Sequence, residues 1–161
     1  MNEEKIQNLI KNKPELVRLL SAYVGKDRNL RYYFEAFDAI YIKKTIPPFS
    51  LLGFIGGLCY LTYRKLYSIG FAVFAISFIA PLLFQKAILI ISFMISYACG
   101  SLFYQIYFKQ FFKTLENAGY GIKPLEEVEE ILKEKGGVDY SAFFLFFLIL
   151  SLQSLTLTPI P

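Results

Sequence analysis

The sixty residues 48–107 carry only three charged side chains, Arg64, Lys65 and Lys86. Two uncharged stretches among them, 66–84 and 87–107, are each long enough for one bilayer crossing. A hydrocarbon core about 30 Å thick requires about 20 apolar residues of helix. Because a helix satisfies its backbone polar groups internally, as lipid requires, this region predicts an all-α integral membrane protein.

More polar segments flank this membrane region. Residues 1–47 show apolar side chains at helical spacing and no run resembling a signal peptide, which predicts a cytoplasmic region of amphipathic helices. Two short helices are expected before Gly25, with Pro14 in the first turn of the second and Gly25 at its end. Residues 108–140 combine amphipathic stretches with glycine breaks, which predicts a cytoplasmic helical insert. Residues 141–161 are uncharged and long enough for a further crossing.

Residues 49–63 leave two topologies open, because this apolar segment is short for a span and contains Gly53, Gly56 and Gly57. If the segment crosses, the chain has four spans, and seven of its 17 basic residues lie outside the cytoplasm. If it is re-entrant or interfacial, about three transmembrane helices remain, and every basic residue except Lys86 is cytoplasmic. The positive-inside rule favours the second arrangement, with the N-terminus cytoplasmic and the C-terminus outside.

The residue types present weigh against catalysis. The chain has no histidine, which removes the commonest metal ligand and the commonest general base. Its two cysteines, Cys59 and Cys99, lie in apolar segments, where a small buried hydrophobe is the usual role. The net charge of +4 comes from basic residues at the ends of apolar segments, so nucleic acid is not the expected partner. We expect no catalytic residue, no cofactor and no metal.

Small residues at four-residue spacing mark candidate helix-packing positions in two segments. They are Gly53 and Gly57 in the first segment, and Ser92, Ser96 and Gly100 in the second. Such rows let helix backbones approach closely, either within one chain or between subunits. Because these motifs are common in membrane helices, packing within the chain is the favoured interpretation.

Four residues at the end of segment 49–63 are candidate interface or membrane-anchor positions, Tyr63, Arg64, Lys65 and Tyr67. Paired basic residues beside a membrane segment usually extend their charged ends to the headgroups and set topology. Binding of an anionic lipid or of a partner's carboxylate is the alternative. Tyr104 and Tyr107, at the end of the span 87–107, are expected in the same aromatic belt.

An acidic helix is expected after Pro124, with Gly136 at its end. Its acidic residues are Glu126, Glu127, Glu129 and Glu130. The favoured interpretation is a solvated helix face. Docking on the basic N-terminal region of the same chain, or on another protein, is the alternative.

Two sequence elements carry most of a resemblance to a known family. They are the tyrosine-rich run 29–37 with the following segment 49–54, and the element Tyr63-Arg64-Lys65-Leu66-Tyr67. Residues 26–137 resemble the bacterial membrane-protein family catalogued as Domain of Unknown Function 2628, to which Gly100 to Tyr104 and Gly136-Gly137 are also similar. The resemblance implies a small bacterial inner-membrane protein with its Tyr63 to Tyr67 element at the cytoplasmic interface. It implies no activity.

The sequence therefore predicts a small multi-pass protein of the bacterial cytoplasmic (inner) membrane that is not an enzyme. The first expected function is that of an adaptor or scaffold that binds a partner through its cytoplasmic helices, with membrane lipid and self-association as further contacts. The alternative is a small oligomeric channel or transporter subunit. Its lining would include the polar positions Ser92, Ser96, Gln153 and Ser154.

Overall fold

The computed structural model describes residues 3–25, 30–83 and 87–157. Within these ranges the chain is all-helical and has no strand, so the predicted all-α class is confirmed. The chain divides into two compact units. The polar unit consists of Met1–Phe49 and Ser101–Gly137, and the apolar unit consists of Ser50–Gly100 and Val138–Pro161.

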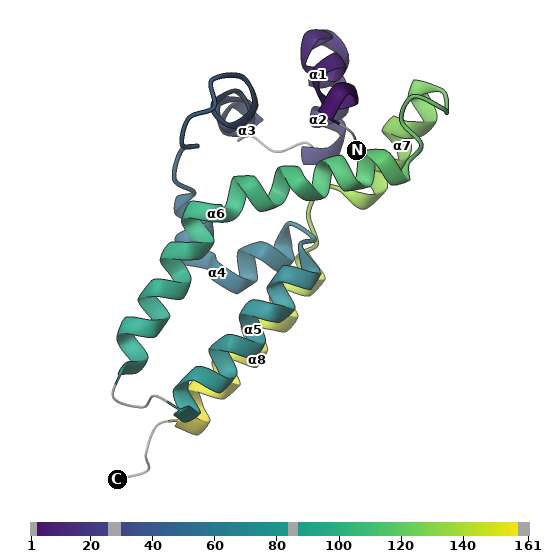
Figure 1. Cartoon of the computed structure of the whole chain (residues 1–161). Helices are drawn as coiled ribbons and strands as arrows, with labels where there is room; N and C mark the ends of the chain where they lie inside the picture. Colours follow the sequence, from purple (N-terminus) through teal and green to yellow (C-terminus); the bar gives the residue numbers. More distant parts are fainter. Residues whose placement is uncertain (1–2, 26–29, 84–86, 158–161) are drawn as a thin grey trace. The chain divides into compact units, whose positions relative to one another are not determined.

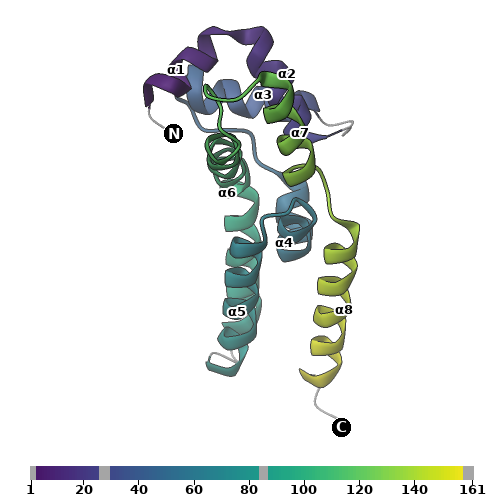
Figure 2. The same ribbon diagram turned by 90° about the vertical axis from the view of Figure 1, so that its right-hand side faces the viewer.

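The polar unit contains most of the short helices. They are α1 (Glu3–Lys11), α2 (Lys13–Val24), α3 (Leu30–Phe37), the π-helical turn η1 (Asp38–Ile42), the second half of α6 (Ile88–Asn117) and α7 (Leu125–Lys135). Figure 2 shows α1, α2, α3 and α7 gathered around the second half of α6. Pro14 lies in the first turn of α2, and Gly25, with a φ of 84°, follows its last residue. The two amphipathic helices predicted before Gly25 are therefore confirmed.

An aromatic stripe on α6 forms the core of the polar unit. Its buried members follow helical spacing and are Phe103, Tyr104, Tyr107, Phe108, Phe111 and Phe112. The ring of Tyr33 on α3 lies 5.0 Å from that of Tyr107, and the ring of Tyr23 on α2 lies 5.3 Å from that of Phe111. Tilted and edge-on ring pairs at such distances add to the stabilisation from burial. The stripe therefore holds α2 and α3 against α6.

The acidic helix α7 packs against α2 in the polar unit. One face of α7 therefore docks on the N-terminal region of the same chain, which was the alternative interpretation of this helix. Val128 and Leu132 of α7 are fully buried, and Arg18 of α2 is 2.6 Å from the carboxylate of Glu129. The chain after α7 is also held there, because the Gly137 amide donates a hydrogen bond of 2.7 Å to the Tyr23 carbonyl. Apolar packing, an ion pair and a backbone hydrogen bond together fix α7.

The apolar unit contains α4 (Leu51–Tyr63), α5 (Tyr67–Leu83), the first half of α6 and α8 (Tyr140–Leu157). In Figures 1 and 2, α5, the first half of α6 and α8 run along a common direction. Figure 1 shows α4 lying across this direction, near the end where α5 and α8 begin. One helix of the described chain, Leu89–Asn117, is long and apolar enough to cross a membrane, whereas α4 and the described part of α5 are apolar but shorter.

Hydrogen bonds fix both ends of α4 at the same end of the apolar unit. At its start, the Ser50 amide donates a bond of 3.0 Å to the carbonyl of Gly100. At its finish, the Tyr63 carbonyl accepts a bond of 2.8 Å from the amide of Asp139, which directly precedes α8. In Figure 1 the first half of α6 returns along α5 toward the end where α5 begins, and Gly100 is the last residue of α6 within the apolar unit. The segment 49–63 therefore starts and finishes on one side of the unit.

A break in α4 accompanies this arrangement. Gly57 has φ 43° and ψ −119°, which is not helical, and the helix kinks there. A positive φ strains residues with a side chain, so glycine is the residue suited to this position. The C-terminal end of α4 is a Schellman motif. The Leu66 amide donates a hydrogen bond to the Leu61 carbonyl, and Lys65, with a φ of 59°, takes the left-handed position.

We expect the substitution Gly136→Ala to destabilise the fold far more than Gly137→Ala. A Cβ at Gly136 would lie 2.1 Å from the Tyr23 carbonyl oxygen, which forces α7 away from α2 and costs about 3 kcal/mol. Gly137 has open space around it but a φ of 74°, so its substitution costs about 1 kcal/mol. Thermal unfolding in detergent, followed by circular dichroism, measures both. Equal losses of stability in the two variants would contradict the close contact between α2 and the end of α7.

Candidate functional sites

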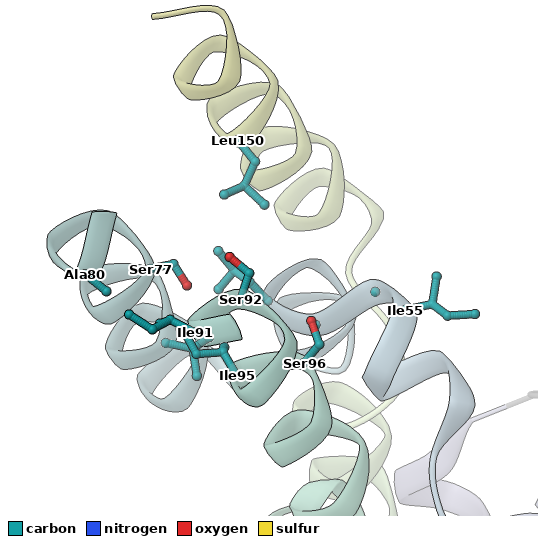
Figure 3. A pocket seen from close by; sticks show the side chains of 12 residues that line it. Ile55, Ser77, Ala80, Ile91, Ser92, Ile95, Ser96 and Leu150 are labelled. Carbon is teal, nitrogen blue, oxygen red and sulfur yellow. The ribbon is translucent and has the colours of Figure 1, made fainter. Parts of the chain in front are cut away.

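A partly open cavity of about 220 Å³ lies among the helices of the apolar unit (Figure 3). Helices α4, α5, α6 and α8 all contribute to its wall, and its polar side chains are Ser77, Ser92 and Ser96. Leu150 reaches it from α8, and the kinked glycine pair Gly56-Gly57 borders it from α4. No charged residue is among the residues that line it. The cavity is large enough for several water molecules, and its hydroxyls suit a small uncharged polar solute.

Helical spacing explains why these serines meet. Val73, Ser77 and Ala80 follow one face of α5, and Ser92 and Ser96 lie one turn apart on α6. Within the described part of the chain, these three hydroxyls make no hydrogen bond to protein. Ser92 is exposed, and Ser77 and Ser96 are half-buried, so solvent as well as a polar guest can bond these hydroxyls.

The predicted packing residues divide between this cavity and a close contact of α4 with α6. Gly53 is buried, and a Cβ there would lie 3.1 Å from the carbonyl of Cys99. Gly100 accepts the amide of Ser50 in the same contact. Gly57, by contrast, has open space around it and forms the kink. The remaining two, Ser92 and Ser96, line the cavity. The side chains of Gln153 and Ser154 lie outside the described residues.

The anchor residues predicted around Arg64 differ in exposure. Arg64 is only 1% exposed, and its guanidinium lies 5.9 Å from the ring of Tyr63, so it does not extend to the surface as the anchor interpretation required. Lys65 is half-buried. Tyr67 is exposed, and its hydroxyl donates a bond of 2.5 Å to Asp139. The second oxygen of Asp139 accepts the Ala142 amide at the start of α8. These residues join α4, α5 and α8.

Tyr104 and Tyr107, expected in an aromatic belt facing headgroups, are instead buried in the aromatic core of the polar unit. Their rings contact Tyr33, with centroids 5.5 and 5.0 Å away. The predicted span 87–107 therefore continues for two turns into the polar unit, whose boundary on α6 falls after Gly100. The apolar pattern of α6 does not distinguish lipid from a protein core, which explains the difference.

A second cavity, a cleft of about 310 Å³, lies in the polar unit. Its lining comes from α1, α2, the α6 to α7 connection and α7, and consists of Lys5, Asn8, Glu15, Tyr120, Gly121, Lys123, Leu125 and Val128. The positive φ values of Gly119 and Gly121 turn the connection sharply. Between that turn and Lys123, the apolar side chain of Ile122 is 85% exposed. The cleft is thus lined by apolar and charged side chains, and the exposed apolar side chain of Ile122 lies beside it.

Charges within the cleft are largely paired. Lys123 forms an ion pair with Glu127, and burial together with hydrogen bonding to Glu15 raises the pKa of Tyr120 to about 12. Tyr120 is therefore neutral at physiological pH. Sequence analysis did not single out Ser77, Tyr120 or Ile122. For Ile122 a signal was present, namely an isolated large apolar residue in a glycine-rich turn.

Comparisons of the chain with protein-family models, with curated proteins and with solved structures gave no match. The resemblance carried by Tyr63 to Tyr67 stays a prediction. The two cavities are consequently interpreted from their own residues. Among the described residues, no group of three or more His, Cys, Asp or Glu side chains lies close enough together to hold a metal ion.

We expect Glu129 to make the fold sensitive to acid. Hydrogen bonds from Lys133 and Arg18 lower the pKa of Glu129, whose side chain is 17% exposed. Because the folded pKa lies below the unfolded value, this stabilisation is complete above about pH 4.5 and is lost as pH falls further. Unfolding measured from pH 6 to 3 should show a flatter profile for Glu129→Gln, with a loss of at most about 1 kcal/mol at pH 6. Glu130→Gln, at an exposed position, is the control and should keep the wild-type profile.

Proposed function

We propose that the chain is a multi-pass protein of the bacterial cytoplasmic membrane that acts as a non-enzymatic adaptor or scaffold. In this proposal α5, α6 and α8 cross the bilayer, α4 is the re-entrant or interfacial element, and the polar unit lies in the cytoplasm with the N-terminus. The chain would then have three crossings. Its contacts would be membrane lipid and a protein partner.

The outward surfaces of the apolar unit support membrane insertion. Large exposed apolar side chains occur on each of its three long helical segments, including Phe71, Ile76, Phe78, Leu89, Ile90, Phe93, Phe144, Phe147 and Leu148. A water-soluble protein rarely exposes large contiguous apolar patches. In lipid these side chains need no cover, and the helices leave no backbone polar group unsatisfied.

The geometry of α4 supports the re-entrant assignment over a fourth crossing. Its two ends are hydrogen-bonded to Gly100 and Asp139 at one end of the apolar unit, and the helix is broken at Gly57. Broken helices are tolerated at membrane depth where protein buries them. This arrangement agrees with the cytoplasmic placement of all basic residues except Lys86, which itself lies outside the described residues.

The adaptor role is carried by one observation, the exposed Ile122 beside the cleft of the polar unit. Protein interfaces concentrate binding energy in a few large apolar or aromatic anchors surrounded by polar groups. Leu125 and Val128 line the cleft, and Lys5 borders it with positive charge, whereas the charge of Lys123 is paired with Glu127. A partner segment with apolar side chains and a carboxylate would match this set. We therefore place the partner surface at the cleft.

A photo-crosslinking amino acid at Ile122 tests this role in native membranes. We expect it to capture one protein reproducibly, as identified by mass spectrometry, and we expect Ile122→Asp to reduce copurification of that protein at least tenfold. The same crosslinker at Tyr32, which is exposed on α3 and does not line the cleft, is the control. Equal capture at both positions, or none, would reject the cleft as the partner surface. Point substitutions are preferable to deletion of α7, because its removal would uncover the core.

The cavity in the apolar unit favours a second candidate function, a small oligomeric channel or transporter subunit. Ser77, Ser92 and Ser96 provide polar groups between the helices proposed to cross the membrane. If solute passes here, Ser92→Leu with Ser96→Leu should abolish solute flux in liposomes, because the two larger side chains fill the cavity. Ile90→Leu, at an exposed position of the same helix, should leave the flux unchanged. Absence of flux in the unmodified protein would remove this candidate.

A further inference from the structure

Large exposed apolar side chains of the polar unit gather in one segment, residues 42–49, which directly precedes the apolar unit. Ile42, Ile46 and Phe49 are all exposed, and Ile46, at 93%, is the most exposed of the large apolar residues that the structure describes. The other such residues of the polar unit are scattered along the chain and are Val17, Tyr32, Leu102 and Ile122. Single exposed apolar residues are ordinary, whereas a cluster of them marks an interaction surface.

The backbone of this segment is irregular, yet few of its amides need an outside partner. Lys44, with a φ of 52°, turns the chain after η1, and the Thr45 amide then donates a bond of 2.7 Å to the Ala39 carbonyl. Pro47 and Pro48 have no amide hydrogen. Irregular backbone exposed to lipid does not occur in the hydrocarbon core. The segment therefore suits the headgroup level, where polar groups and water remain available.

The charge of the segment is exclusively positive. Lys43 and Lys44 are its only charged side chains, and both are exposed. Lys43 forms an exposed ion pair of 2.7 Å with Asp38, which is the last acidic residue before Glu116. Exposed ion pairs contribute little, so this pair leaves Lys43 able to contact another anion. Basic side chains beside exposed apolar ones match an anionic membrane surface, which offers phosphates above an apolar layer.

The covalent chain keeps the segment next to the apolar unit, which begins at Ser50. The Ser50 amide is bonded to Gly100, the last residue of α6 in that unit. Because an extended chain covers at most about 3.6 Å per residue, the Cα atom of Ile46 lies within about 14 Å of that of Ser50. With the apolar unit in the bilayer as proposed, Ile46 is thus in reach of the headgroup layer, which is about 5 to 8 Å deep.

We propose that residues 42–49 form an interfacial segment that binds the cytoplasmic leaflet of the membrane. Ile46 and Phe49 enter the boundary between headgroups and acyl chains, and Lys43 and Lys44 contact the phosphates of anionic phospholipids. The inference rests on the proposed membrane insertion of the apolar unit. It adds the side chains of the polar unit that meet the lipid surface and the class of lipid that they select.

The sequence contains no tryptophan, so Ile46→Trp places a unique fluorescent reporter in the segment. The full chain is reconstituted in vesicles of phosphatidylcholine and phosphatidylglycerol, with or without bromine atoms on the acyl chains, which quench tryptophan that they approach. We expect blue-shifted emission and quenching, because the side chain lies at the acyl boundary. Ile122→Trp, at a similarly exposed position of the polar unit, is the control and should keep unquenched, water-like emission.

Lys44→Gly in the Ile46→Trp chain tests the charge without loss of the fold, because glycine suits a φ of 52° better than lysine. One basic residue near an anionic leaflet accounts for about a fivefold change in binding, so the ratio of inserted to free segment should fall about fivefold. Vesicles of phosphatidylcholine alone should show no such change, and the unfolding temperature should not fall. The matched control Lys11→Gln, at an exposed position of α1, should leave the quenching unaltered. Unaltered quenching in Lys44→Gly would overturn the selection of anionic lipid.

Phe93→Trp, at an exposed position of the first half of α6, reports on the apolar unit itself. If Phe93→Trp is quenched and Ile46→Trp is not, this inference fails and the membrane proposal stands. If Phe93→Trp is not quenched, both fail. Equal quenching of Ile46→Trp and Ile122→Trp would also overturn the inference, because lipid contact would then not be specific to residues 42–49.

Discussion

The packing of the aromatic stripe on α6 is the interaction on which the polar unit depends. Its rings fill the space between α2, α3 and η1, and Tyr33 alone contacts three of them, Phe103, Tyr104 and Tyr107. Short helices such as α3 are marginal in isolation, because nucleation is unfavourable and few hydrogen bonds follow. Contact with a longer helix supplies the burial that they lack. The cleft and the position of α7 follow from this framework, since α7 packs on α2.

Backbone hydrogen bonding has the corresponding role in the apolar unit. A short helix that begins and ends within an apolar surrounding leaves amide and carbonyl groups that need partners. Ser50 and Asp139 meet this need at the two ends of α4, with a side-chain oxygen of Ser50 capping Gly53 and the amide of Asp139 bonded to Tyr63. The kink at Gly57 then brings the broken part of α4 next to the serines of α5 and α6.

The sequence predicted helix positions well where capping residues and apolar spacing agree. Pro14 and Gly25 bound α2 as expected, and Pro124 and Gly136 bound α7. The roles of individual residues in the candidate sites were harder to predict from the sequence. The four-residue spacing of Gly53 and Gly57 does not distinguish their roles. Gly53 packs against α6 and Gly57 breaks α4, and this difference arises from neighbours distant in sequence. Arg64 was expected near the surface beside Lys65, but the surrounding helices bury it.

By itself, the sequence determined the all-helical class, the two amphipathic helices before Gly25 and the concentration of apolar residues in three long segments, because these features depend on local spacing and residue type. Only the tertiary structure decided that Tyr104 and Tyr107 belong to a protein core, that both ends of α4 meet one side of the apolar unit, and that Ile122 borders a cleft. Apolar periodicity specifies that a helix face is buried. What covers that face depends on contacts between segments far apart in the chain.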